Sequence, residues 1–184
     1  MSKTKEIQDQ INEWKEKYGD IYALPVDDKT GYLRSPDMVD YKRAFTAMQK
    51  GGDVAFGEEM LKALWLGGDE EILNDDDYFL PARKEMLSFF NYPDAEIIST
   101  KNNHQIIIGE AQCVIRTITR NDLKLAEKKN PGNKPFITQE KLFEIVCLEK
   151  DEAFNNKKNA EIRFPLFQAI EQLQNKKTAL LKKL

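Results

Sequence analysis

The sequence predicts an α+β protein built from two tandem, related units, each a β-hairpin or small antiparallel sheet followed by about three helices. Three patterns lead to this prediction. Several segments repeat apolar residues at helical spacing, two segments rich in β-forming residues are interrupted by turn residues, and the order of these elements recurs along the chain. We therefore expect a first unit over residues 1–90 and a diverged second unit over 91–184, which ends in a long helix.

The first unit is expected to begin with an amphipathic helix and a hairpin. In residues 4–18 the apolar side chains are four, three and four positions apart: Ile7, Ile11, Trp14 and Tyr18. This spacing places them on one helical face, and Gly19 can end the helix as its C-cap. Residues 21–26 and 32–34 are predicted to be strands, because the intervening residues 27–31 favour a tight turn.

Three helices are expected to complete the first unit, over about 36–49, 54–65 and 78–89. Ser35 can cap the first of them, because its hydroxyl can accept a backbone hydrogen bond, and Pro36 suits the first helical position. Pairs of glycines favour the ends of the first and second helices.

The second unit is predicted to repeat this order. Residues 96–118 are expected to be strands, with turns at 101–103 and near 109–110. Helices are expected over about 119–129 and 138–147, the latter capped by Thr138. The final helix is predicted over 164–184, which is longer than its unit needs, so part of it could dock on a partner or on a second copy.

A constant offset of 82 residues aligns the two halves without a gap from Val26 to Glu70. The identical pairs are Arg34/Arg116, Asp40/Asp122, Lys42/Lys124, Ala44/Ala126, Glu58/Glu140, Leu66/Leu148, Asp69/Asp151 and Glu70/Glu152. Apolar positions correspond as well. The sequence therefore predicts that an ancestral module was duplicated, with a period too long for a solenoid repeat.

Composition narrows the possible functions. The net charge is −3, so we expect no general nucleic-acid binding, which usually requires a basic surface. The apolar stretches are too short for a membrane span, and the polar start of the chain does not resemble a secretory signal. Cys113 and Cys147 are predicted to be isolated reduced thiols. We expect no cofactor and no catalytic residue.

Two features could nevertheless carry chemistry. Residues 69–77 hold a run of carboxylates, and hard cations such as Ca²⁺ take oxygen ligands, so a metal protein or an enzyme is one alternative. The run lacks the EF-hand spacing, and its counterpart in the second half replaces the later acids with lysines. The prediction is therefore a solvated loop without a metal. His104 is the single histidine, which disfavours a histidine-based zinc or catalytic site, and we expect it on a strand surface.

Aromatic side chains provide the predicted protein-binding surface, because large amphipathic side chains favour interfaces. The candidates are Trp14, Tyr18, Tyr22, Trp65, Phe89, Phe90, Tyr92, Phe164 and Phe167. The alternative is that they fill the two small cores.

Residues 11–87 resemble a pattern found in small phage-encoded proteins of the tail-assembly-chaperone type. The matching residues are Trp14, Tyr18, Gly19, Tyr32, Leu33, Arg34, Pro36, Trp65, Gly67, Gly68, Asp69 and Glu70. The second half matches only through its likeness to the first, and it lacks the equivalents of Pro36 and Trp65.

The resemblance implies a non-enzymatic phage protein that acts in the host cytoplasm during virion or tail assembly. Such chaperones shield long, aggregation-prone helical tape-measure chains, and they tend to self-associate, so a homo-oligomer is expected. Two related units would present two similar surfaces to a repetitive partner. The alternative within this class is a structural virion component, such as a ring, a connector or a packaged protein.

Overall fold

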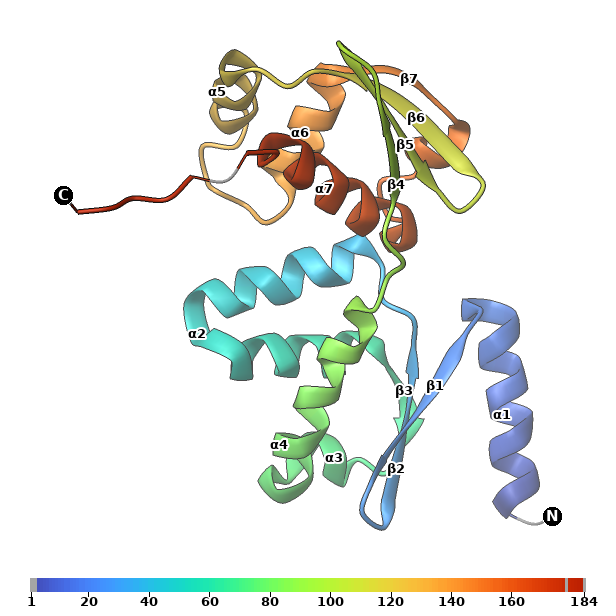
Figure 1. The fold of residues 1–184 in the computed structure, drawn as a ribbon. Helices are drawn as coiled ribbons and strands as arrows, with labels where there is room; N and C mark the ends of the chain where they lie inside the picture. Colours follow the sequence, from blue (N-terminus) through green and yellow to red (C-terminus); the bar gives the residue numbers. More distant parts are fainter. Residues whose placement is uncertain (1–2, 178, 184) are drawn as a thin grey trace. The chain divides into compact units, whose positions relative to one another are not determined.

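The computed structural model describes residues 3–177 and 179–183, and its contacts divide the chain into two compact units, Met1–Asn91 and Tyr92–Leu184. Helices and two small antiparallel sheets make up the described residues, which confirms the predicted α+β class (Figure 1). Among the described helices, none combines the length and the apolar character needed to span a bilayer.

Unit 1 is a three-stranded antiparallel sheet with helices on both faces. Its elements are α1 (Lys3–Tyr18), β1 (Ile21–Val26), β2 (Lys29–Arg34), α2 (Met38–Leu64), β3 (Trp65–Gly68), α3 (Glu71–Asn74), α4 (Asp76–Glu85) and the 3₁₀ helix η1 (Met86–Phe90). The strand order is β1-β2-β3. Helices α2, α3 and α4 lie on one side of the sheet and α1 lies on the other (Figure 1). The core lies on the side of α2, where Leu24, Leu33 and Met60 are buried.

Unit 2 is a four-stranded antiparallel sheet with its helices on one face. Its elements are β4 (Glu96–Ser99), β5 (Asn103–Ile108), β6 (Ala111–Arg116), α5 (Arg120–Lys128), α6 (Ile137–Val146), β7 (Cys147–Lys150), the 3₁₀ helix η2 (Glu152–Asn155) and α7 (Ala160–Gln174). The strand order is β4-β5-β6-β7. Alternate residues of β5 and β6 face the helices and are buried, among them Ile106, Cys113 and Ile115.

A largely buried ion pair joins the hairpin of unit 1 to α2. Arg34, at the end of β2, donates hydrogen bonds to both oxygens of Asp40, at 2.7 and 2.9 Å. The same guanidinium donates to the carbonyl of Ala63, in the last turn of α2, at 2.8 Å. Asp40 also accepts from the backbone N–H of Asp37, the N-cap of α2. This one pair therefore fixes the end of β2 against both ends of α2.

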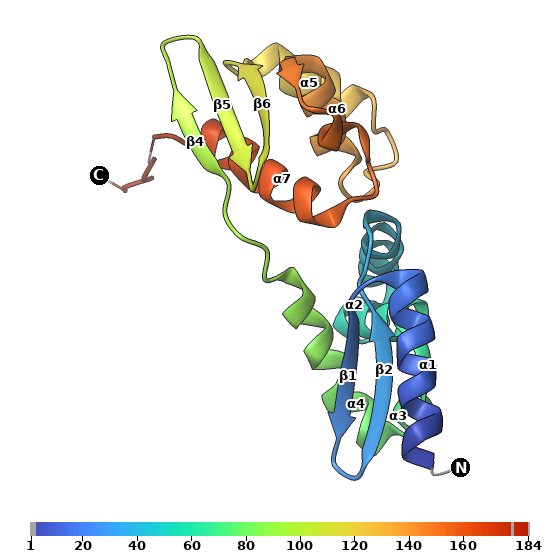
Figure 2. The ribbon, with the colours of Figure 1, turned by 90° about the vertical axis from the view of Figure 1, so that its right-hand side faces the viewer.

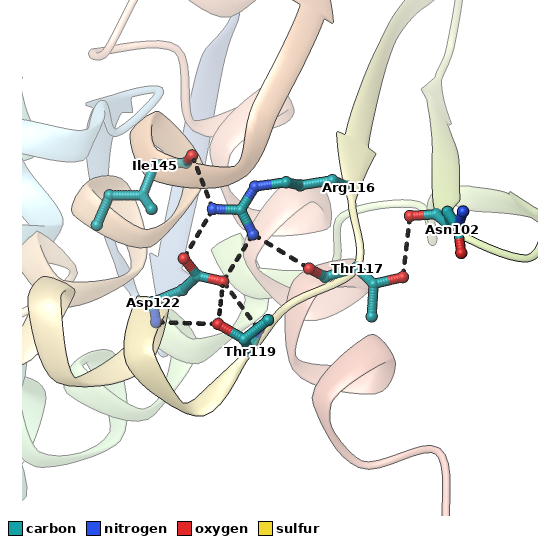
Figure 3. A network of polar contacts seen from close by, with 6 residues as sticks. All are labelled: Asn102, Arg116, Thr117, Thr119, Asp122 and Ile145. Carbon is teal, nitrogen blue, oxygen red and sulfur yellow. Dashed lines mark hydrogen bonds and ion pairs between the residues drawn. The ribbon is translucent and has the colours of Figure 1, made fainter.

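Unit 2 contains the same network (Figure 3). Arg116 donates to both oxygens of Asp122 at 2.7 Å, and to the carbonyl of Ile145 at 3.5 Å. Thr119 caps α5 and donates its backbone N–H to Asp122. The hydrogen bonds from Arg116 hold the pKa of Asp122 well below its usual range. Each residue of this unit 2 network lies 82 positions after the residue that makes the same contact in unit 1.

Further contacts recur at this offset. The Asp69 carboxylate accepts from the backbone N–H of Thr30 at 2.8 Å, and Asp151 accepts from that of Gln112 at 2.7 Å. The pairing of β2 with β3 is interrupted by an irregularity at the same place as the pairing of β6 with β7. Corresponding residues thus have the same structural role, while duplication, as a statement about ancestry, stays a prediction.

The helix after the first hairpin differs from its prediction. Asp37, not Ser35, is the N-cap of α2, because its carboxylate accepts the N–H groups of Val39 and Asp40. The two predicted helices are joined in one element, and the predicted break appears as a kink at Gly52, where φ is 69°. The third predicted helix is α4 followed by the 3₁₀ turn of η1.

Three predictions for local structure are wrong. The sequence does not predict β3 or β7, because each is a four-residue strand that directly follows a helix and is held by pairing with β2 or β6. Thr138 does not cap α6, which begins at Ile137; its hydroxyl instead accepts a hydrogen bond from Asn130.

The final helix is also shorter than predicted. It ends at Gln174, and the described residues beyond it, 175–177 and 179–183, are not helical. Leu184, its predicted end, lies outside the described residues. In this lysine-rich segment Leu181 is 99% exposed, so it contributes no packing that would hold a helix in place.

His104 lies in the interior of unit 2 and not on the predicted strand surface. Its Nε2 lies 3.2 Å from Lys176 Nζ and its Nδ1 lies 2.8 Å from Ser99 Oγ. Because an ammonium group can only donate, Nε2 accepts and the ring proton resides on Nδ1, which donates to Ser99. Burial, together with the charge of Lys176, lowers the pKa of His104.

We therefore expect unit 2 to lose stability in mild acid. The unfolded histidine has a pKa of about 6.5, so the contribution of neutral His104 is complete above that pH. It is lost as the pH falls from there toward the lower pKa of the folded state. In urea unfolding between pH 7.5 and 5, His104→Gln should flatten this dependence. An unchanged pH dependence in the variant would contradict the assignment.

The Arg116–Asp122 pair should be a strong determinant of stability. Asp122→Asn removes the charge that compensates Arg116, so the free energy of unfolding of unit 2 should fall by about 2 kcal/mol. Chemical denaturation measures this change. Glu127→Gln, on the exposed side of the same helix, serves as the control and should have little effect. Equal effects of the two substitutions would refute a special role for the pair.

Candidate functional site

The outer face of each sheet is the face turned away from α2 and α4 in unit 1, and from α5, α6 and α7 in unit 2. In unit 1, α1 packs on the part of it formed by β2 and β3, and β1 lies clear of the helix (Figure 2). The Trp14 ring packs on Tyr32, with 5.7 Å between ring centroids. The indole also fills the space over Gly67, where an added Cβ would lie 3.1 Å from it. An amphipathic helix with an aromatic anchor therefore occupies this face.

The outer face of unit 2 carries no helix among the described residues (Figure 1). The strand register places Ile98, Ile107 and Val114 on it, with Ile98 and Val114 both opposite Gln105 on their neighbouring strand. Ile98 is 46% exposed, and Ile107 and Val114 are half-buried. We call this surface, defined by Ile98, Ile107 and Val114, the open face.

Polar side chains surround the apolar residues of the open face. Gln105 donates to the side-chain oxygen of Gln112 at 2.6 Å, which ties the two amides together. Glu96 and Glu149 are exposed on the two edge strands, β4 and β7. The open face thus has a zigzag apolar stripe, from Ile98 through Ile107 to Val114, with Gln105 and Gln112 between and beside these residues and a carboxylate near each edge. This arrangement suits an amphipathic helix with basic side chains along the borders of its apolar face.

Two differences separate the outer faces of the units. At the offset of 82 residues, Val114 corresponds to Tyr32 and Glu149 corresponds to Gly67. The ring that supports Trp14 in unit 1 is therefore absent from the open face, and a longer acidic side chain takes the position that a glycine leaves free. The open face consequently favours a helix with aliphatic anchors over one with a tryptophan.

Most of the predicted aromatic residues of unit 1 are half-buried and packed against other rings or glycines. Trp14 holds α1, and Trp65 lies directly against Gly31, where an added Cβ would clash with the indole. Phe90 packs on Tyr41 with 4.8 Å between centroids.

Two other predicted residues of unit 1 keep more of their surface. Tyr22 meets Phe89 edge to face at 5.0 Å and stays 42% exposed. Tyr18 is 38% exposed, with Lys17 over its ring. A role of these aromatic residues in partner binding stays a prediction, and Tyr18 and Tyr22 offer the most exposed area for it.

The predicted residues of unit 2 form one aromatic cluster. Tyr92 stacks on Phe164 at 5.2 Å, and Phe136 contacts both Phe164 and Phe167. Phe167 is buried. The residues of the open face are not among those predicted, although runs such as Ile106-Ile107-Ile108 break the alternation of a half-buried strand and could have indicated a sheet with two apolar faces.

The acidic run of unit 1 is divided among separate structural roles. Asp69 accepts from the backbone of Thr30, Glu71 pairs with Lys29 at 2.9 Å, and Asp75 caps α4. In the part of the chain that the structure describes, His, Cys, Asp and Glu side chains form no group of three or more that could hold a metal ion.

The two cysteines are free thiols. Burial raises the pKa of Cys113 to about 12, and burial also raises that of Cys147. Both are therefore protonated at neutral pH, which makes them poor nucleophiles.

Comparison with protein-family models, with curated proteins and with solved structures gives no match. The open face is therefore interpreted from its own chemistry.

Replacing Trp14 with alanine should release α1 from the outer face of unit 1. The half-buried indole contributes about 2 kcal/mol to this contact. Amide hydrogen exchange in α1 should accelerate accordingly, while the exposed substitution Lys15→Ala on the same helix should leave it unchanged. Undiminished protection of α1 in the Trp14 variant would show that the helix is held by other contacts.

Proposed function

We propose that this chain is a non-enzymatic binding protein that holds an amphipathic helix of a partner protein on its open face. We further propose that it acts in phage virion assembly, as a chaperone-like binder of a tape-measure or other virion protein. One observation carries the first part: α1 packs on the outer face of unit 1, whereas the outer face of unit 2 exposes Ile98 and carries no helix among the described residues.

A helix fits the open face better than an added strand does. The edge strands β4 and β7 have four residues each, which leaves little backbone for pairing with a further strand. The flat surface of the sheet, in contrast, presents side chains from three strands side by side. In unit 1 the same kind of surface binds α1 through side chains alone, which provides the precedent within this chain.

The open face supports weak and reversible binding. Complete burial of an Ile or Val side chain contributes about 1.5–3 kcal/mol, and these three are already partly covered, so together they would contribute about 3 kcal/mol. Such a contact is useful when it is repeated. Several copies along a long helical partner would bind with avidity while each remains free to exchange. This behaviour suits a chaperone, which must release its client when assembly begins.

The nature of the partner is proposed from a different observation, the resemblance of residues 11–87 to tail-assembly chaperones. Tape-measure chains are long and helical and expose apolar faces before the tail tube surrounds them. An amphipathic client of that kind has the chemistry that the open face would recognise.

Co-expression with the proteins encoded next to this chain tests the proposal. A long helical partner should co-purify with the wild-type chain. The double variant Ile98→Glu, Val114→Glu places charges in the apolar stripe and should reduce the recovered partner by about tenfold or more. Circular dichroism would show that the variant remains folded.

Leu125→Glu is the matched control, because Leu125 lies on α5 of the same unit and is 49% exposed. It should not affect recovery. Full recovery with the double variant, or equal losses with the control, would refute the open face as the binding surface. Mass spectrometry of finished particles adds a second criterion, because a chaperone should be absent from them, whereas a structural component should be present.

A further inference from the structure

Unit 1 contains an apolar pocket that its packing does not fill. The pocket has a volume of about 340 Å³, and its lining residues are Phe45, Met48, Asp53, Phe56, Arg83, Lys84 and Leu87. They come from α2, on both sides of its kink, from α4 and from η1. This volume lies within the range of pockets that bind small molecules, about 300–1,000 Å³. Four apolar side chains and a few convergent charges give it the composition of such a site.

The charges at this pocket favour an anion. Arg83 and Lys84 contribute two cations, and Asp53 contributes one carboxylate. The Nε–H of Arg83 is buried and has no hydrogen-bond partner among the described residues. A ligand acceptor beside this guanidinium would form a charge-assisted hydrogen bond with it.

Unit 2 has an aromatic ring at the position that corresponds to Arg83. Helix α4 contains Pro81, and helix α7 contains Pro165. Aligning the two helices on these prolines gives an offset of 84 residues. At this offset Phe167 takes the position of Arg83. Phe167 is buried and stacks on Phe136 with 6.1 Å between centroids. A buried aromatic ring therefore stands in unit 2 where unit 1 has the arginine.

We infer that this pocket, the Arg83 pocket, binds a monoanionic amphiphile, meaning an apolar chain or ring that carries one carboxylate. The apolar part would lie against the Phe45–Phe56 ring pair and Leu87. The carboxylate would accept hydrogen bonds from the planar guanidinium of Arg83, which matches a carboxylate in geometry. Asp53 would oppose a ligand with more negative charge. This inference is independent of the open face and goes beyond helix binding.

Calorimetric titration of the full chain with decanoate tests the inference, with decanol as the neutral probe of similar apolar length. Decanoate should bind saturably with one site per chain, and decanol should bind about tenfold more weakly or worse. Arg83→Gln should remove most of this preference, and Arg83→Lys should restore part of it. Lys62→Gln on α2, where the lysine pairs with Glu58 outside the pocket, is the control and should bind as wild type does.

A second variant keeps the test decisive if Arg83→Gln does not fold. Leu87 is 63% exposed, so Leu87→Glu should be tolerated, and its carboxylate should repel decanoate more than decanol. Equal binding of the two probes to the wild-type chain would overturn the inference in favour of a purely apolar cavity. Absence of saturable binding below about 1 mM, or decanoate binding that Arg83→Gln and Leu87→Glu leave unchanged, would overturn it as well.

Discussion

The contact between an arginine at the end of a hairpin and a carboxylate in the first turn of a helix is the constraint on which each unit depends. A guanidinium and a carboxylate removed from water must satisfy each other and their remaining hydrogen bonds. Arg34 and Arg116 do so only where the strand end, the helix N-terminus and a later helix carbonyl converge. Because the arginine holds the last turn of α2 or α6 near the end of the hairpin, the strand that follows the helix runs beside the hairpin. This strand, β3 or β7, completes the sheet.

The same scaffold therefore supports two different surfaces. In unit 1 a helix anchored by Trp14 covers the outer face, and a cavity beside Arg83 remains unfilled. In unit 2 no helix among the described residues covers the outer face, and Phe167 stacks on Phe136 where the aligned position of unit 1 holds Arg83. If the units descend from one module, each has kept a different surface available for binding.

The parts of the fold that local chemistry determines could be predicted from the sequence. Turn residues predict both hairpins, the predicted helix over about 119–129 matches α5, and the repetition of Arg and Asp at one offset indicates a shared framework. Features that depend on residues far away in the sequence could not be predicted from it. The strands β3 and β7 exist through pairing with residues far along the chain, and His104 is buried by contacts with Ser99 and Lys176. The isoleucine run 106–108 indicates a sheet with apolar residues on both faces, but the structure is needed to show that the helices lie on one side and leave the other open.

The central claim is that the open face binds a helix, and methyl NMR of the full chain tests it most directly. With isoleucine methyl groups labelled, the co-purified partner should shift or broaden the signals of Ile98 and Ile107. The signals of Ile106 and Ile115, buried on the opposite side of the same sheet, should change much less. Changes confined to residues away from Ile98 and Ile107, or no change at saturating partner, would contradict the account.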